Sequence, residues 1–132
     1  MFPPNTKILI ADDMMTMRKI VTKVCKELGY SDIMEASDGA KAWEAVAGAV
    51  PPFGLIISDW NMPNSSGLDL LKRVRADSRF AKTPFMLVTA EAEQGQIVEA
   101  VKAGVDGYVV KPFDAAVLKE RLGGVYKKRF GG

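Results

Sequence analysis

The chain has 132 residues, of which 48% are hydrophobic and 26% are charged, a balance typical of one globular domain with a hydrophobic core. The net charge of +2 is too small to indicate nucleic acid or a membrane surface as a partner. There is no histidine, which excludes histidine-based triads, general bases and metal sites, so that any metal must have oxygen ligands.

The single cysteine and the absence of long apolar segments in the sequence indicate the cellular compartment, and the first residues indicate where the domain begins. One cysteine, Cys25, excludes an intramolecular disulfide and suits a reducing environment. No apolar run approaches the roughly 20 residues of a membrane span. Residues 1–6 lack the basic and apolar regions of a signal peptide. We therefore expect a cytoplasmic protein without a membrane partner, with a flexible leader over residues 1–6 and one domain over residues 7–130.

Short apolar runs alternate with amphipathic segments along the chain. The residues from Met17 to Leu28 have apolar side chains at helical spacing, and Gly29 ends this pattern. The run Leu55-Ile-Ile57 predicts a strand buried on both faces. Ser66-Gly-Leu-Asp69 has the form of a capping box that opens a helix. In chain order, the predicted strands are residues 7–11, 32–36, 55–57, 85–88 and 107–110, and the predicted helices are residues 17–28, 39–49, 66–74, 91–103 and 115 onward.

This alternation predicts the fold class. Short apolar strands that alternate with helices are typical of an α/β domain in which helices cover both faces of a parallel sheet. No repeat, low-complexity tract or linker interrupts the pattern. The sequence therefore predicts one α/β domain.

Polar residues follow four of the predicted strands: Asp12-Asp13 after the first, Asp59 after the third, Thr89 after the fourth and Lys111 after the fifth. Parallel strands end at the same edge, where open sheets place their ligands, so we expect these side chains to meet. Two carboxylates about 5 Å apart repel by roughly 3 kcal/mol at an effective dielectric near 20. Three of them need a cation, and Mg²⁺ prefers oxygen ligands of this kind.

The candidate Mg²⁺ ligands are Asp12 or Asp13, Asp59 and the backbone carbonyl of Asn61. One of the first two can instead cap the following helix, which leaves the second carboxylate unexplained. A carboxylate beside a metal and a lysine can attack a phosphoryl group to give an aspartyl phosphate. Thr89 can then donate a hydrogen bond to a phosphoryl oxygen. Singly, Thr89 and Lys111 also fit as an ordinary strand-end residue and a surface lysine.

Four motifs resemble those of bacterial response-regulator receiver domains. They are Leu9-Ile-Ala-Asp-Asp13, Asp59-Trp-Asn-Met-Pro63, Val88-Thr-Ala90 and Tyr108-Val-Val-Lys-Pro-Phe113. The resemblance covers nearly the whole chain, and the segment from Ser58 to Asn64 is similar to the chemotaxis members of the family in particular. It implies a flavodoxin-like, doubly wound five-stranded parallel sheet in the order 2-1-3-4-5, with five helices.

The resemblance also implies the chemistry of the strand ends. It makes Asp59 the phosphoacceptor and Lys111 the partner of the phosphoryl group. It places Mg²⁺ on Asp12, Asp13, Asp59 and Asn61. We also expect a cis peptide at Lys111–Pro112, as in receivers, because the ammonium must turn back over the strand ends.

Further positions are implied to carry the signal. Thr89 and Tyr108 are expected to form a switch, with Thr89 also counted among the catalytic residues. Asn61 and Glu91 occupy the two positions that tune dephosphorylation in this family. Ser65-Ser66, Gly95 and Gly123-Gly124 depart from the family pattern, so the effect of these positions on partner binding stays open.

The resemblance implies a monomeric signalling switch and not an enzyme, one that catalyses only its own phosphorylation and dephosphorylation. A histidine kinase of the chemotaxis type would supply the phosphoryl group, and the phosphorylated protein would bind a target, with the flagellar motor switch protein as the expected one. The alternatives are a relay receiver that passes phosphate to a histidine phosphotransferase, and an aspartyl-phosphate phosphatase. A phosphatase of that kind needs a second aspartate where this chain has Asn61. A nucleotide-binding module is disfavoured because no glycine-rich loop follows the first strand.

Overall fold

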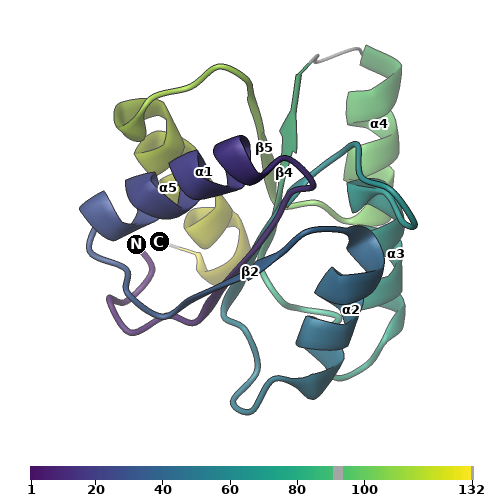
Figure 1. Cartoon of the computed structure of the whole chain (residues 1–132). Coiled ribbons are helices and arrows are strands. Elements are labelled where there is room, and N and C mark those ends of the chain that lie inside the picture. The colour runs from purple at the N-terminus through teal and green to yellow at the C-terminus, as the bar shows by residue number, and fades with distance from the viewer. Residues whose placement is uncertain (91–93, 132) are drawn as a thin grey trace.

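The computed structural model describes residues 1–90 and 94–131, and within them strands alternate with helices along the chain (Figure 1). The strands are β1 (Ile8–Ala11), β2 (Ile33–Ala36), β3 (Leu55–Asp59), β4 (Phe85–Thr89) and β5 (Gly107–Val110). The helices are α1 (Met15–Glu27), α2 (Gly39–Gly48), α3 (Gly67–Ala76), α4 (Gln94–Ala103) and α5 (Ala115–Phe130). None of the helices in these described ranges is long and apolar enough to cross a membrane.

All five strands form one parallel sheet in the order β2-β1-β3-β4-β5, which confirms the predicted fold class and strand order. Helices α1 and α5 lie side by side on one face of the sheet, and α2, α3 and α4 cover the other (Figure 1). Because every connection is a strand–helix–strand crossover, all strands end at the same edge of the sheet.

The core divides into two layers because successive side chains of a strand point to opposite faces. In β1, Ile8 and Ile10 pack under α1 and α5, whereas Leu9 and Ala11 pack under the other helices. All four side chains are at most 1% exposed. Burial on both faces explains why β1, β3 and β4 have nearly continuous apolar runs in the sequence.

The predicted helices need small corrections. Ile20 is one of the apolar residues in the helical pattern from Met17 to Leu28, which predicts burial, but it is 43% exposed. It lies about 100° around the helix from the buried Val21, at the side of the buried face. Helix α2 ends at Gly48, one residue earlier than predicted. The helix predicted over residues 91–103 is described from Gln94, and residues 91–93 lie outside the described part of the chain.

The first residues are packed against the domain. The prediction of a flexible leader over residues 1–6 did not anticipate this packing. Phe2 is 5% exposed, and its ring meets that of Tyr126 edge to face at 5.2 Å between centroids. The Tyr30 hydroxyl donates a hydrogen bond to the Phe2 carbonyl oxygen at 3.0 Å. A large aromatic side chain gains free energy from such burial, and this gain opposes the entropy of a free terminus.

A buried ion network lies at the edge of the sheet where the strands begin. Asp106 precedes β5, and its carboxylate accepts hydrogen bonds from Arg75 at 2.9 Å, from Arg129 at 3.0 Å and from the Phe85 amide at 2.9 Å. Arg75 also donates to the carbonyl oxygen of Gly104 at 3.0 Å. Since a buried carboxylate is tolerated only with several donors, this network accounts for the burial of Asp106 and joins α3, β4 and α5.

Helix α5 continues without interruption through Gly123-Gly124. A Cβ atom built on Gly124 would meet no atom within 4 Å, so alanine fits there. Glycine inside a helix costs up to about 1 kcal/mol relative to alanine. We therefore expect Gly124→Ala to raise the free energy of unfolding by several tenths of a kcal/mol to about 1 kcal/mol in urea denaturation.

Gly107→Ala is the matched control, because a Cβ there would lie 2.8 Å from the Val125 side chain, which would have to move. This variant should be less stable than the parent. If Gly124→Ala is no more stable than the parent, or less stable, the low helix propensity of Gly124 is not its main effect on stability.

Candidate functional site

The register of the sheet brings the polar strand ends together. Ala11 of β1 pairs with Ser58 of β3, so the next residues along the two chain segments, Asp12 and Asp59, lie next to each other. Asp59 in turn pairs with Val88 of β4, which precedes Thr89. The sequence prediction that these residues meet at one edge of the sheet is therefore confirmed for Asp12, Asp59 and Thr89.

Three carboxylates form a cluster at this edge. One oxygen each from Asp12, Asp13 and Asp59 can be chosen so that all lie within 4.8 Å of one another. Asp12 is 2% exposed and Asp59 is 7% exposed, whereas Asp13 is exposed to solvent. Two buried carboxylates and one open one give a divalent ion protein ligands on one side and room for water on the other, which is the arrangement that Mg²⁺ favours.

Lys111 supplies the positive charge of the site. Its ammonium lies 3.2 Å from Asp59 Oδ1 and 3.5 Å from Asp12 Oδ2. The side chain is 16% exposed, so it is not the surface lysine of the alternative interpretation. The Lys111–Pro112 peptide bond is cis, as predicted, and a second cis bond that was not predicted lies at Val50–Pro51.

One Lys111 ammonium does not neutralise the cluster. The pKa of Asp59 is raised above its ordinary value, first by burial of the carboxylate and second by the negative charge of Asp12. Lys111 acts in the opposite direction but does not cancel these effects. The site therefore holds an excess of negative charge that a bound cation would relieve.

Asp12 also serves the start of α1, which decides between the two interpretations of the acidic pair. Met14 occupies the cap position of α1 and makes no side-chain cap bond. Instead, the Met14 amide donates to Asp12 Oδ1 at 2.9 Å. One oxygen of Asp12 thus orders the helix start, and its other oxygen faces Lys111. Asp13 has no such role in the helix and stays available to a ligand.

The loop after β3 ends at Gly67, which packs against the backbone of Asp59 and Trp60. No function was predicted for this glycine from the sequence. The Gly67 amide donates to the Trp60 carbonyl oxygen at 2.8 Å. A Cβ atom at Gly67 would collide with the Asp59 carbonyl oxygen and would lie 2.9 Å from the Leu87 side chain. The predicted capping box of Ser66 and Asp69 is present and begins α3 at this point. The signal in the sequence is a glycine directly after a capping serine.

Asn61 lies in the same loop, where it is exposed. Together with Asp13, Met62, Pro63 and Ser66 it borders an open hollow of about 410 Å³ beside the cluster. The position fits the predicted role of Asn61 beside a metal or a phosphoryl group, and that role stays a prediction. Glu91, the second predicted tuning residue, lies outside the described residues.

The two predicted switch residues are diagonal neighbours on adjacent strands. Thr89 pairs with Val110, and Tyr108 pairs with Leu87, two residues earlier on each strand. Residues two apart share a face, so both side chains point to the face covered by α2, α3 and α4. Thr89 is 4% exposed, and Tyr108 is partly buried against the core on that face. Their coupling stays a prediction.

The charge excess predicts a pH-dependent cost to stability. A carboxyl whose pKa is higher in the folded than in the unfolded state holds its proton more tightly when folded, so stability falls as pH rises between those two values. Asp59→Asn removes the charge. We expect it to raise the free energy of unfolding at pH 7 by on the order of 1 kcal/mol in buffer without divalent ions.

Urea unfolding across pH tests this expectation. The advantage of Asp59→Asn should shrink as pH falls through the folded pKa and vanish near pH 3, because Asp59 is then protonated in the parent. Asp32→Asn is the control, since it makes the same change at an exposed residue near the opposite edge of the sheet. A neutral or destabilising effect of Asp59→Asn at pH 7 would contradict the charge argument.

Comparison with known proteins agrees with this geometry. The family model of the response regulator receiver domain matches residues 8–123. "Chemotaxis protein CheY-3" of Vibrio cholerae is 46% identical over 124 residues, which are 94% of this chain and 94% of that protein. "Chemotaxis protein CheY1" of Helicobacter pylori is 47% identical over 116 residues, covering 88% of this chain and 93% of its own length.

Solved structures lead to the same conclusion. The chemotaxis response regulator CheY4 of Vibrio cholerae superposes with a TM-score of 0.83 and 33% identity over 92% of this chain and 98% of its own. The receiver domain of the sensor histidine kinase PA1611 from Pseudomonas aeruginosa, solved with a magnesium ion in its active site cleft, shares the fold at a TM-score of 0.80 and 23% identity, over 97% of this chain and 99% of its own. The chain therefore belongs to the response regulator receiver domain family.

Proposed function

We propose that this receiver is a phosphorylation switch in which Asp59 accepts a phosphoryl group from a phosphohistidine of a sensor kinase. The observation that carries the proposal is the position of the Asp59 carboxylate, buried within the acidic cluster and 3.2 Å from the Lys111 ammonium. A carboxylate oxygen of Asp59 forms the bond to phosphorus while the bond from phosphorus to the imidazole nitrogen breaks. The electron pair stays with that nitrogen, which takes a proton from solvent.

The residues around Asp59 have separate proposed roles in the transfer. Lys111 pairs with the negative charge of the phosphoryl oxygens. Asp12, Asp13 and Asp59, with the Asn61 carbonyl, would hold Mg²⁺, which would neutralise charge on the transferred group. The magnesium ion in the active site cleft of the PA1611 receiver domain supports Mg²⁺ as the ion. The protein would act only on its own phosphorylation and dephosphorylation, and would turn over no other substrate.

The names of the relatives support a role in chemotaxis. The proposed donor is a histidine kinase, and the proposed target is a protein of the flagellar motor switch, bound by the phosphorylated form. A cytoplasmic location and a monomeric state belong to the same proposal. The phosphatase alternative is disfavoured, because Asn61 stands where that chemistry needs a second carboxylate.

Phosphorylation by a small acyl phosphate with Mg²⁺ tests the site directly. Intact-mass analysis should show one phosphoryl adduct in the parent and in the control Asp32→Asn, and none in Asp59→Asn. An adduct retained in Asp59→Asn would place the phosphoacceptor elsewhere. Steady hydrolysis of a free phosphoester would favour the phosphatase, and transfer from the phosphorylated protein to a histidine phosphotransferase would favour the relay.

The switch is tested by separating phosphorylation from target binding. A phosphoryl group on Asp59 offers oxygens that attract the Thr89 hydroxyl, and a shift of Thr89 would leave space for Tyr108 to turn inward. Such a shift alters target affinity only through a difference in affinity between the two states. We expect Thr89→Ala to be phosphorylated but to show at most about a tenth of the parent's gain in target affinity, which is a loss of at least about 1.4 kcal/mol in coupling free energy.

The measurement is a binding titration with the proposed target, the motor switch protein, for parent and variant, with and without phosphorylation. Val98→Ala is the control, because Val98 is exposed on α4 and is not one of the residues of the site. It should keep the parent's ratio between phosphorylated and unphosphorylated affinities, even if both affinities change. An undiminished gain in fully phosphorylated Thr89→Ala would exclude this route from site to surface.

A further inference from the structure

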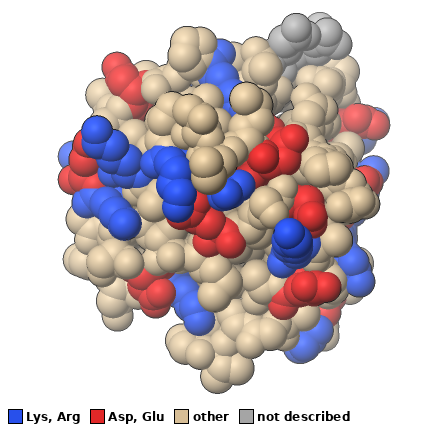
Figure 2. All heavy atoms as spheres, in the orientation of Figure 1, with Lys and Arg blue, Asp and Glu red and all other residues tan. Residues whose placement is uncertain are grey.

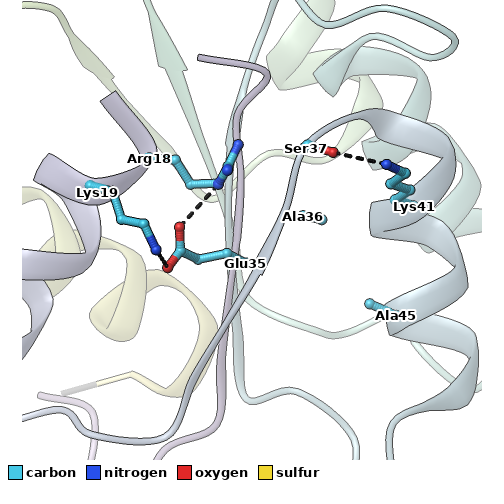
Figure 3. A pocket seen from close by; sticks show the side chains of 7 residues that line it. All are labelled: Arg18, Lys19, Glu35, Ala36, Ser37, Lys41 and Ala45. Carbon is cyan, nitrogen blue, oxygen red and sulfur yellow. Dashed lines mark hydrogen bonds and ion pairs between the residues drawn. The ribbon is translucent and has the colours of Figure 1, made fainter. Parts of the chain in front are cut away.

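Arg18 links α1 to β2 and to the residue that follows β1, next to the acidic cluster. Its Nη1 atom donates to the backbone carbonyl oxygen of Asp12 at 2.8 Å, and its Nε atom donates to Glu35 Oε1 at 3.0 Å. The side chain leaves α1 and points to Glu35 of β2 (Figure 3), and it also reaches the residue that follows β1. It is 15% exposed, so its position is set by these contacts rather than by solvent.

Lys19 contacts the same carboxylate in a different way. Its ammonium lies 2.9 Å from Glu35 Oε2, and its side chain is 63% exposed. Figure 3 shows Arg18 and Lys19 approaching Glu35 from α1, whereas Lys41 on α2 points to Ser37. All five residues line an open hollow of about 260 Å³. Lys19 therefore shares the charge environment of Arg18 but is bonded to Glu35 and not to Asp12.

The Arg18 bond completes the support of Asp12. The Asp12 amide donates to the Ala36 carbonyl oxygen at 3.0 Å, and Asp12 Oδ1 accepts from Met14. The Asp12 carbonyl oxygen belongs to the peptide that links Asp12 to Asp13. A donor on that oxygen fixes the orientation of the peptide and thereby the relative positions of both carboxylates.

The charge of Arg18 alone would work against a metal at this site. Lys and Arg side chains gather over α1 on the face seen in Figure 2, and a guanidinium near the cluster lowers its affinity for a second cation. Glu35 accepts from both Arg18 and Lys19 and so offsets part of this charge. The arrangement keeps the geometric constraint of the guanidinium and reduces its electrostatic cost.

We propose that Arg18 is a positioning residue of the metal site, held in place by Glu35, and that it acts by fixing the Asp12–Asp13 peptide rather than through its charge. The proposal rests on the proposed function in that Mg²⁺ is taken as the ion. Geometry and charge predict opposite effects when Arg18 is removed, since loss of a cation tightens metal binding and loss of the bond weakens it.

A Mg²⁺ titration of the full chain, monitored by the fluorescence of Trp60 next to Asp59, shows whether loss of Arg18 weakens or tightens Mg²⁺ binding. Removing a side chain that orients a metal ligand typically weakens metal affinity by about tenfold or more, and we expect this of Arg18→Met. The loss should persist in high salt, where charge effects are screened. Lys19→Met is the matched control, because it removes the same charge without a contact to Asp12, and it should bind Mg²⁺ as tightly as the parent or more tightly.

Hydrogen exchange of the Met14 amide in metal-free protein gives a second readout. This amide donates to Asp12 Oδ1, so a loosened turn should expose it, and exchange should be several times faster in Arg18→Met than in Lys19→Met. If Arg18→Met does not fold, Arg18→Lys replaces it. That variant keeps the charge but has one nitrogen in place of the two, Nε and Nη1, that donate to Glu35 and Asp12. Positioning therefore predicts weaker Mg²⁺ binding, whereas charge alone predicts unchanged Mg²⁺ binding.

The inference is overturned if Arg18→Met binds Mg²⁺ as tightly as the parent, or if Lys19→Met weakens binding equally. Failure of the proposed function looks different. In that case the parent itself would neither bind Mg²⁺ nor accept a phosphoryl group on Asp59. The exchange comparison contains no metal and would still decide whether Arg18 holds the turn, with equal exchange in both variants counting against it.

Discussion

Mutual repulsion among Asp12, Asp13 and Asp59 is the constraint to which the rest of the structure responds. Their oxygens can come within 4.8 Å of one another, and each pair at about 5 Å repels by roughly 3 kcal/mol at an effective dielectric near 20. Burial first and the charge of Asp12 second raise the pKa of Asp59, and Lys111 does not offset these two effects. The hydrophobic layers on both faces of the sheet hold the carboxylates in place against this repulsion. A cation or a phosphoryl group then changes the balance of forces at the site directly.

The two edges of the sheet treat buried carboxylates in opposite ways. At the edge where the strands begin, Asp106 receives donors from Arg75, Arg129 and the Phe85 amide, so its charge is balanced. At the edge where they end, Asp59 and Asp12 share the ammonium of Lys111. The balanced edge joins α3, β4 and α5 and serves stability. At the other edge, the excess of negative charge is an unfavourable interaction that a bound cation would relieve.

The sequence predicted what local patterns determine. Continuous apolar runs identified the strands, and the parallel sheet that they imply predicted that Asp12 and Asp59 meet at one edge. Contacts between distant segments were missed. Arg18 lies outside the apolar positions of the helix pattern, and Glu35 lies in a short strand whose first three residues alternate between partly buried and exposed. Nothing in either neighbourhood specifies their bond, and the same holds for Phe2 with Tyr126 and for Asp106 with its two arginines. Such pairs depend on how helices settle on the sheet, which periodicity does not record.

The position of the site within the sheet shows where a change at Asp59 can travel. Strands β1 and β3 are buried along their length and lie between other strands, so they resist movement. Strand β5 is an edge strand, and only Val109 of its residues is fully buried. The Lys111 amide donates to the Thr89 carbonyl oxygen at 2.8 Å, which ties the ends of β4 and β5 together. The two residues expected to contact a phosphoryl group are thus bonded to each other at the less buried side of the sheet. A shift of either residue meets least resistance toward β5, where Tyr108 lies, and most resistance toward the central strands.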